Sequence, residues 1–362
     1  MKKDFHVSLI IPFYNSEKDI TSCIDTIKNQ DINDKIEIIF VDDCSKDSTA
    51  EIIKNSKLSN YKLLSLNENK GPSAARNEGI VNASGDYVFF LDVDDTIESK
   101  TLSILYETAK KGEYDMVFCD KKRIYDNKNF RDKIFAFNDD KEFNYEDITS
   151  EIKKRVTDPD YTVGVAGCHG KLIKRSILTD NNISFENKLR FLEDEIFIID
   201  ILGYSKKIKY IKKQLYIYNI NPDLPSGRSN AFNFDFPAQN FKIMRNHIKK
   251  SLENRNCNLG EVFNFSNQAL IYYLIYTLIS YSLCIFRGKV NFKKGLIIRK
   301  KIIKEILNDY EIIEASKYYK KSKNESYWIP KAIQFQSTKF LEIACNLRTK
   351  SLLNKAKNQK NK

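Results

Sequence analysis

The feature that most constrains the fold is a regular alternation of short apolar runs and helical segments over the first 95 residues. The intervening segments carry helix-capping residues, or apolar residues spaced three and four apart. The apolar runs are VSLIIPFYN (7–15), IEIIFVDD (36–43), YKLLSLN (61–67) and DYVFFLDVDD (86–95). Because strands that are joined by helices run parallel, this alternation predicts an α/β fold with a mostly parallel sheet and helices on both faces.

Polar side chains gather where these apolar runs end. Asn15 closes the first run, Asp42 and Asp43 close the second, residues 67–69 follow the third, and residues 92–95 close the fourth. Ligands of parallel sheets bind outside the carboxyl ends of the strands, so we expect these clusters to converge on one edge. A solvated turn would explain any one cluster alone. The convergence favours a site, and the three crowded carboxylates of the last cluster favour a bound cation.

The rest of the chain gives a less regular pattern. We predict a helix over 101–111, a strand over 114–120, and a charged, irregular surface excursion over 121–160. Order returns in three segments, 169–178, 191–202 and 207–220, and the last of them is typical of a strand. From about residue 235 the pattern is mostly helical. We therefore expect two domains, a sheet domain over 1–225 and a mainly helical, basic region over 226–362.

The excess positive charge is confined to the C-terminal part of the chain. The net charge is +12, yet residues 287–362 hold 20 basic and 6 acidic residues, and the rest holds 40 basic and 42 acidic residues. A basic segment of this kind indicates an anionic partner, which is either nucleic acid or an anionic membrane surface.

An uncharged stretch of eighteen residues, ALIYYLIYTLISYSLCIF (269–286), directly precedes this basic segment. It reaches the lower edge of transmembrane length. Three interpretations stay open: a helix packed against the protein, an interfacial membrane helix, and a true span. The basic run that begins at Arg287 favours contact with anionic lipid on the cytoplasmic face.

The N-terminus and the cysteines bear on cellular location. The apolar stretch in MKKDFHVSLIIPFYN is too short for a signal peptide, so we expect a first strand there. The seven cysteines are scattered and form no CxxC pair, which favours reduced cytosolic thiols over a zinc site or a disulfide framework.

Five ordered sequence blocks resemble the family 2 glycosyltransferases of the GT-A fold. In this chain the blocks are PFYN (12–15), VDDCSKDST (41–49), GPSAARNEG (71–79), DVDD (92–95) and LEDE (192–195). A DxD motif alone would be weak evidence, but five blocks in order and at compatible spacing make the resemblance specific. It covers residues 5–220, and the C-terminal region gains nothing from it.

The resemblance implies a nucleotide-sugar donor and a divalent metal, Mn²⁺ or Mg²⁺, because carboxylates suit an ion that bridges a diphosphate. It makes Asp94 the first metal ligand, places Asp92 near the donor ribose or the metal, and makes Asp95 a second ligand or a support for the metal shell. The remaining donor-binding residues that it implies are Pro12 and Tyr14 at the nucleoside, Asp43 at the base, and Asn69 and Arg76 near the diphosphate.

The same resemblance points to the catalytic base. Direct displacement at the anomeric carbon inverts it and needs one carboxylate to accept the proton of the acceptor hydroxyl. We expect Asp194 to be this base, with Glu193 as its neighbour and second choice. An ordinary acidic helix N-terminus is the alternative explanation for this pair.

Two positions depart from the pattern or stay ambiguous. Many relatives place Arg or His after the Y-x-Y of the late strand, where this chain has Asn219, and Arg228 could supply the missing positive charge. His169 in GCHGKL is either a polar residue near the acceptor groove or a part of the catalytic site.

We therefore expect an inverting, metal-dependent glycosyltransferase. It would move a hexose or N-acetylhexosamine from a UDP-linked nucleotide sugar to a saccharide acceptor in polysaccharide, capsule or lipopolysaccharide synthesis. The acceptor could be lipid-linked, and the expected location is cytoplasmic, at the inner face of the membrane. A sugar nucleotidyltransferase is the alternative, but the chain has no Gly-rich loop near its N-terminus. A basic nucleic-acid-binding protein is disfavoured, because the excess positive charge is confined to the C-terminal tail and the sequence has no motif for DNA or RNA recognition.

Overall fold

The computed structural model describes residues 4–125, 136–157, 167–220, 237–320 and 326–360. The chain forms two compact units. Unit 1 comprises Met1–Ile148, Thr162–Asn187 and Leu192–Pro222, and unit 2 comprises Thr149–Tyr161, Lys188–Phe191 and Asp223–Lys362. The expected division after residue 225 falls within 221–236, outside the described residues.

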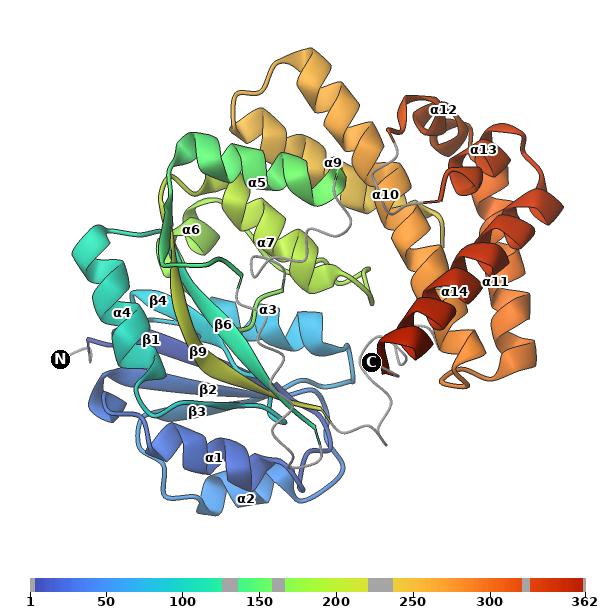
Figure 1. The fold of residues 1–362 in the computed structure, drawn as a ribbon. Coiled ribbons are helices and arrows are strands. Elements are labelled where there is room, and N and C mark those ends of the chain that lie inside the picture. Colours follow the sequence, from blue (N-terminus) through green and yellow to red (C-terminus); the bar gives the residue numbers. More distant parts are fainter. Residues whose placement is uncertain (1–3, 126–135, 158–166, 221–236, 321–325, 361–362) are drawn as a thin grey trace. The chain divides into compact units, whose positions relative to one another are not determined.

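Unit 1 is built on one mixed sheet (Figure 1). The strand order is β3-β2-β1-β4-β8-β6-β9-β5, and β7 pairs with β9. The strands are β1 (Val7–Phe13), β2 (Ile36–Asp42), β3 (Tyr61–Ser65), β4 (Tyr87–Phe90), β5 (Thr96–Ile97), β6 (Met116–Tyr125), β7 (Lys141–Phe143), β8 (Lys171–Lys174) and β9 (Ile208–Ile220). The first four strands are mutually parallel, as predicted, whereas β8 runs antiparallel to β4 and to β6.

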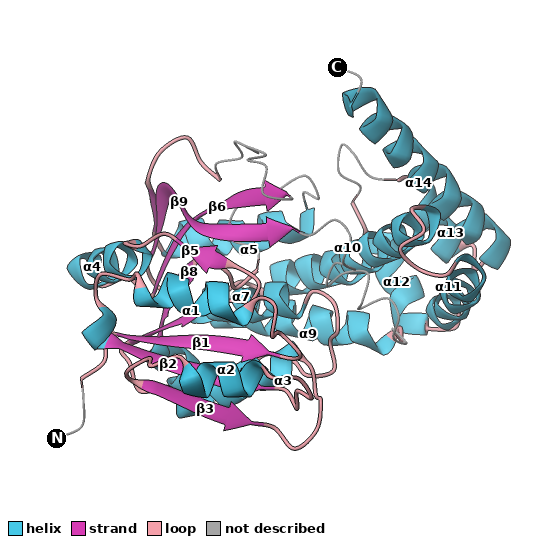
Figure 2. Ribbon diagram, turned by 90° about the horizontal axis from the view of Figure 1, so that it is seen from below, coloured by secondary structure: helices cyan, strands magenta, loops and turns pink. Residues whose placement is uncertain are grey.

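Helices cover both faces of the sheet, as Figure 2 shows. The helices of this part of the chain are α1 (Ile20–Lys28), α2 (Thr49–Asn55), α3 (Pro72–Asn82), α4 (Thr101–Gly112), α5 (Tyr145–Thr157), α6 (Arg175–Asp180) and α7 (Glu193–Tyr204), with a short 3₁₀ turn η1 (Asn33–Lys35). The α/β fold class is therefore confirmed.

Side-chain alternation along the strands decides which helix covers which face. Leu9 and Ile11 of β1 belong to the core that α1, α2 and α4 close. Ile10 points to the opposite face, where α3 packs so closely that a Cβ on Gly79 would come within 2.3 Å of the Ile10 side chain. Phe90 of β4 contacts Phe197 of α7 edge-on.

The prediction of an irregular excursion over 121–160 was wrong in part. Strand β6 continues to Tyr125 because it pairs with β9 beyond a register shift at Asp120. Helix α5 follows at Tyr145–Thr157, and it buries Ile148, Ile152 and Val156 completely. These three residues are spaced four apart, which is the apolar period of a helix. The many charges of the segment obscured this period.

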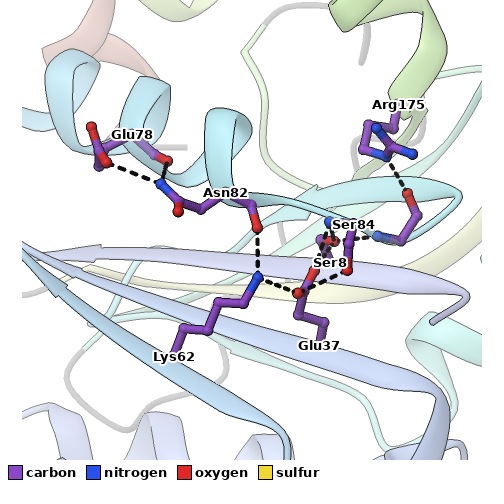
Figure 3. A network of polar contacts seen from close by, with 8 residues as sticks. Ser8, Glu37, Lys62, Glu78, Asn82, Ser84 and Arg175 are labelled. Carbon is purple, nitrogen blue, oxygen red and sulfur yellow. Dashed lines mark hydrogen bonds and ion pairs between the residues drawn. The ribbon is translucent and has the colours of Figure 1, made fainter. Parts of the chain in front are cut away.

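A buried acidic network joins three strands at the edge opposite the polar clusters (Figure 3). Glu37 in β2 is 2% exposed and accepts hydrogen bonds from Ser8 Oγ at 2.7 Å, Ser84 N at 2.8 Å and Ser84 Oγ at 2.9 Å. Lys62 Nζ lies 2.6 Å from Glu37 Oε1. The network secures the turn that precedes β4.

Unit 2 is mainly helical, as expected. Its helices are α9 (Gln239–Asn254), α10 (Leu259–Phe286), α11 (Phe292–Leu307), α12 (Tyr310–Tyr318), α13 (Trp328–Gln334) and α14 (Thr338–Lys360). Helix α10 is long and apolar enough to cross a membrane, but 78% of its most apolar window is buried inside the protein. It packs against α9, α11, α12 and α14. In this structure α10 is thus the core helix of unit 2.

Candidate active site

Hydrogen bonds link the four loops that leave the carboxyl ends of β1 to β4. Asn15 after β1 donates its backbone N–H to Ser45 Oγ and accepts one from Lys46 N. Both carboxylate oxygens of Asp43 after β2 accept backbone N–H groups from the next loop, Lys70 N at 2.7 Å and Gly71 N at 2.8 Å. The polar clusters therefore converge on one edge of the sheet, as predicted.

Arg76 on α3 joins the fourth loop to this edge. Its Nη2 lies 2.8 Å from Asp92 Oδ1, and its guanidinium stands over the ring of Phe185. Arg76 is 5% exposed, and its Nε is buried without a hydrogen-bond partner among the described residues. A guanidinium with a remaining donor is suited to hold an anion.

His169 completes the contacts of Asp92. His169 Nε2 lies 2.7 Å from Asp92 Oδ2, so both oxygens of this carboxylate are engaged. Burial alone would raise the pKa of Asp92, but His169 and Arg76 outweigh burial and hold that pKa well below its usual range. Asp92 therefore stays ionised.

Asp95 is also held by two hydrogen bonds. It is fully buried, its Oδ2 accepts a hydrogen bond from the Tyr216 hydroxyl at 2.6 Å, and its Oδ1 accepts the backbone N–H of Asn219 at 3.0 Å. Asn219 Nδ2 also donates to the backbone carbonyl of Asp94 at 2.9 Å. Asn219, which replaces the Arg or His of many relatives, thus connects β9 to residues 92–95, the acidic loop. Arg228, the suggested substitute, lies outside the described residues.

Asp94 is the exposed member of the acidic cluster. No side chain among the described residues donates a hydrogen bond to its carboxylate. Burial of its ionisable group and the charge of Asp92 raise the pKa of Asp94 to about 6, and burial together with the charges of Asp92 and Asp94 raises that of Asp95 to about 8. The three carboxylates each offer one oxygen, and these oxygens lie within 4.8 Å of one another. A divalent cation at this position would favour the ionised forms of Asp94 and Asp95, whose pKa values are raised.

The predicted catalytic pair starts helix α7. Glu193 and Asp194 occupy its first turn, after Leu192 in a left-handed conformation. Asp194 Oδ1 accepts the backbone N–H of Glu195 at 2.8 Å. A Cβ on Gly167 would lie 2.8 Å from Asp194 Oδ2, and the φ of Gly167 is +75°. Glycine at this position leaves room for the second carboxylate oxygen.

Glu193 lies within electrostatic reach of Arg76 and Asp92. Burial and the neighbouring charge of Asp194 raise the pKa of Glu193 to about 7, while Arg76 opposes this rise. The structure therefore brings the α7 pair and the Asp92 cluster to one site. A carboxylate that titrates near neutral pH is suited to general base catalysis.

The other predicted donor-binding residues lie at the same edge but outside this network. Pro12 is buried at the end of β1, whereas Tyr14 and Asn69 are exposed in the loops. The side chains of Tyr14 and Asn69 make no hydrogen bond to other described residues.

Sequence reasoning overlooked a buried cation near the α7 pair. Lys171 in β8 is fully buried, and burial together with the charge of Lys121 lowers its pKa to about 7. Asp194 is among the charges that act on it. A lysine within the apolar run GKLI was the available signal, because strands seldom bury an ammonium group.

Comparison with known proteins shows a family similarity in the N-terminal part of the chain. The family model described as Glycosyl transferase family 2 matches residues 8–180. Residues 8–180 of the chain are therefore similar to glycosyl transferase family 2. The resemblance inferred from the five sequence blocks is thereby confirmed.

Two relatives with named sequences come from bacteria. The glycosyltransferase EpsJ of Bacillus subtilis is 30% identical over 227 residues, which are 60% of this chain and 62% of EpsJ. A poly(ribitol-phosphate) beta-glucosyltransferase of Bacillus spizizenii is 33% identical over 221 residues, which are 60% of this chain and 32% of the relative. The chain thus covers less than two thirds of the length of these relatives.

A solved structure shares the fold of nearly the whole chain. The crystal structure of residues 1–349 of TarS from Staphylococcus aureus, in complex with UDP-GlcNAc, aligns with a TM-score of 0.70 over 94% of this chain and 91% of that one. The two sequences are 19% identical over this alignment. The likeness establishes the GT-A fold and its helical C-terminal region.

Proposed function

We propose that this chain is an inverting glycosyltransferase. It transfers a hexose or N-acetylhexosamine from a UDP-linked nucleotide sugar to a saccharide acceptor in the synthesis of a cell-surface polymer such as a capsule or lipopolysaccharide. The observation that carries the proposal is the open carboxylate of Asp94, which stands between two firmly held carboxylates at the ligand-binding edge of the sheet. The relatives support it, since one is named for glucosyl transfer to poly(ribitol phosphate).

The acidic cluster would hold Mn²⁺ or Mg²⁺. Asp94 has an uncommitted carboxylate and serves as the direct ligand. Both oxygens of Asp95 and of Asp92 already accept hydrogen bonds, so Asp95 supports the shell, and Asp92 contributes a remaining lone pair to the metal or to the ribose. A bound divalent ion would supply Lewis-acid stabilisation of the departing diphosphate.

The donor would lie across the four linked loops. Pro12 and Tyr14 line the nucleoside pocket, and Asp43 accepts a hydrogen bond from the base with lone pairs that its two backbone contacts leave open. Asn69 and Arg76 lie near the diphosphate. The buried, unpartnered Nε of Arg76 supports this role, because a buried donor without a partner is unfavourable and a bound anion could supply an acceptor.

The reaction needs one base for the acceptor hydroxyl. We assign this role to Asp194, whose Oδ2 has the space left by Gly167, and we assign Glu193 to the adjacent position. Direct displacement with one base inverts the anomeric carbon.

A donor screen tests the proposal. The purified chain is incubated with individual nucleotide sugars and Mn²⁺, and release of the nucleoside diphosphate is measured. We expect turnover of a UDP-sugar that is lost in the D94N variant. A chain that instead makes nucleotide sugar and pyrophosphate from a nucleoside triphosphate and a sugar phosphate would be a sugar nucleotidyltransferase, and the proposal would be wrong.

A further inference from the structure

Helix α11 and the turn before it present a strongly basic outer surface. Between residues 286 and 304 the chain has no acidic residue. The exposed basic residues of this segment are Arg287, Lys289, Lys293, Lys294, Lys300, Lys301 and Lys304. The lysines of the helix share one side of it, because Lys293 and Lys300, like Lys294 and Lys301, are seven residues or about two turns apart, and Lys304 follows one turn later.

The opposite side of α11 is fixed against the core of unit 2. Ile302 and Ile303 are buried, and a Cβ on Gly295 would come within 2.7 Å of Ile285 in α10. The buried Arg299 donates from Nη1 to Ser282 Oγ at 2.9 Å. Packing of α11 against the core of unit 2 therefore fixes which side of the helix carries the exposed lysines.

Large apolar side chains stand among these cations. Phe286 is 37% exposed, Phe292 is 52% exposed and Ile297 is 70% exposed. The rings of Phe286 and Phe292 contact each other edge-on at 6.1 Å between centroids. Exposed aromatic residues beside lysines are typical of segments that lie in a membrane interface.

We propose that this surface, the α11 face (the seven exposed basic residues with Phe286, Phe292 and Ile297), docks unit 2 onto an anionic lipid bilayer. The lysines attract the lipid phosphates, and the three apolar side chains enter the boundary between headgroups and acyl chains. A nucleic acid or another soluble polyphosphate would use the charges but would leave Phe292 and Ile297 in water. The mixed composition therefore favours lipid.

This docking specifies the contact with anionic lipid that the basic run after Arg287 led us to expect, and it does not use α10 as a membrane helix. Helix α10 keeps its apolar side chains inside unit 2, so it has few of them to offer to lipid. The docking is also independent of the proposed reaction, because donor hydrolysis in solution does not require a bilayer. It would place the enzyme peripherally at the cytoplasmic face of a membrane, where a lipid-linked acceptor is accessible.

Sedimentation with vesicles tests the proposal on the full chain. Vesicles of phosphatidylcholine that contain phosphatidylglycerol should bind the protein, and vesicles of phosphatidylcholine alone should not. Each lysine near an anionic surface contributes roughly a fivefold increase in affinity. The variant K293Q/K294Q/K300Q/K304Q should therefore lose more than about one hundredfold.

Matched variants distinguish an effect of the α11 face from the effect of losing positive charge or apolar surface elsewhere on the protein. K54Q/K57Q/K100Q/K111Q removes four exposed lysines from unit 1, and it should keep most of the lipid affinity. F292S/I297S should weaken binding strongly. V81S/L259S removes two side chains that are at least as exposed, and it should have little effect. Circular dichroism and donor hydrolysis confirm that each variant is folded and active.

Three results would overturn the proposal. These are the absence of binding to the anionic vesicles, equal loss in the two lysine variants, and full binding by F292S/I297S. An RNA oligonucleotide or soluble polyphosphate could also remove the protein from the vesicles. If it does so equally well with the wild type and F292S/I297S, the surface binds a soluble polyanion instead.

Discussion

The hydroxyl of Tyr216 donates a hydrogen bond of 2.6 Å to the fully buried carboxylate of Asp95. The same hydroxyl accepts the backbone N–H of Asp92 at 3.4 Å, so one side chain from β9 orients both ends of the acidic loop. Burial and the charges of Asp95 and Asp92 raise the pKa of Tyr216 well above its ordinary value, and the hydroxyl therefore stays a donor.

Replacing Tyr216 with phenylalanine should loosen this loop. The variant leaves a buried carboxylate with one partner fewer, which we expect to cost about 1–3 kcal/mol of folding free energy. Affinity for Mn²⁺ should fall as well, because Asp95 no longer holds the loop in place. Thermal unfolding and calorimetric Mn²⁺ titration measure the two effects. The Y218F variant, two residues along the same strand, is the control and should change neither by a comparable amount.

The three aspartates should respond differently to substitution by asparagine. D94N should abolish Mn²⁺ binding and donor turnover while the unfolding temperature stays near that of the wild type, because the side chain is exposed. D95N should lower the unfolding temperature as well, since its carboxylate accepts two buried hydrogen bonds. Equal Mn²⁺ affinity in D94N and the wild type would rule out Asp94 as the principal ligand.

The sheet and its acidic edge were predictable from local sequence, because buried strands need continuous apolar runs and their ends carry the polar residues. The contacts that distinguish the three aspartates at this edge were not predictable from the sequence. His169 pairs with Asp92 across 77 positions, and Asn219 reaches the backbone of Asp94 across 125 positions. Such contacts depend on the antiparallel insertion of β8 and on the register of β9, neither of which leaves a local pattern. Helix α5 is different: its spacing of Ile148, Ile152 and Val156 was present and was obscured by charge.

Metal binding and stability should depend on pH in opposite directions. The pKa values of Asp94 and Asp95 are raised to about 6 and about 8 without metal, so between pH 4 and 8 the folded state binds more protons than the unfolded state. The stability of the metal-free protein should then decrease as pH rises through this window. Mn²⁺ affinity should increase over the same window, because the ion replaces those protons.

Unfolding curves at several pH values, with EDTA or with Mn²⁺, measure both trends. The D94N variant is the control, since it should show a shallower pH dependence without metal. Stability of the metal-free wild type that rises steadily from pH 5 to pH 8 would contradict the raised pKa values.

The two acids of α7 should be separable by kinetics. D194N should leave UDP-sugar binding intact and reduce transfer by at least about a hundredfold, the range of a lost general base. E193Q should keep part of the activity and change the pH profile near pH 7, where Glu193 titrates. G167A should resemble a weak D194N, because the new Cβ would crowd Asp194 Oδ2 and strain a backbone at φ +75°. Unimpaired transfer by D194N would exclude Asp194 as the base and would leave Glu193 as the candidate.

The Glu37 network should affect stability without affecting chemistry. Glu37 is buried, and E37Q removes a charge that Lys62, Ser8 and both donors of Ser84 compensate. We expect a loss of about 1–3 kcal/mol in the free energy of unfolding, because donors at the start of β4 lose part of their acceptor. K62M should cost less, since Lys62 is 44% exposed and Glu37 keeps its serine partners. Urea unfolding measures both, and E51Q on the exposed side of α2 is the matched control. Because the network lies at the strand ends opposite the acidic loop, turnover per folded molecule should be unchanged in E37Q, and a selective loss of turnover would show that the network also positions the site.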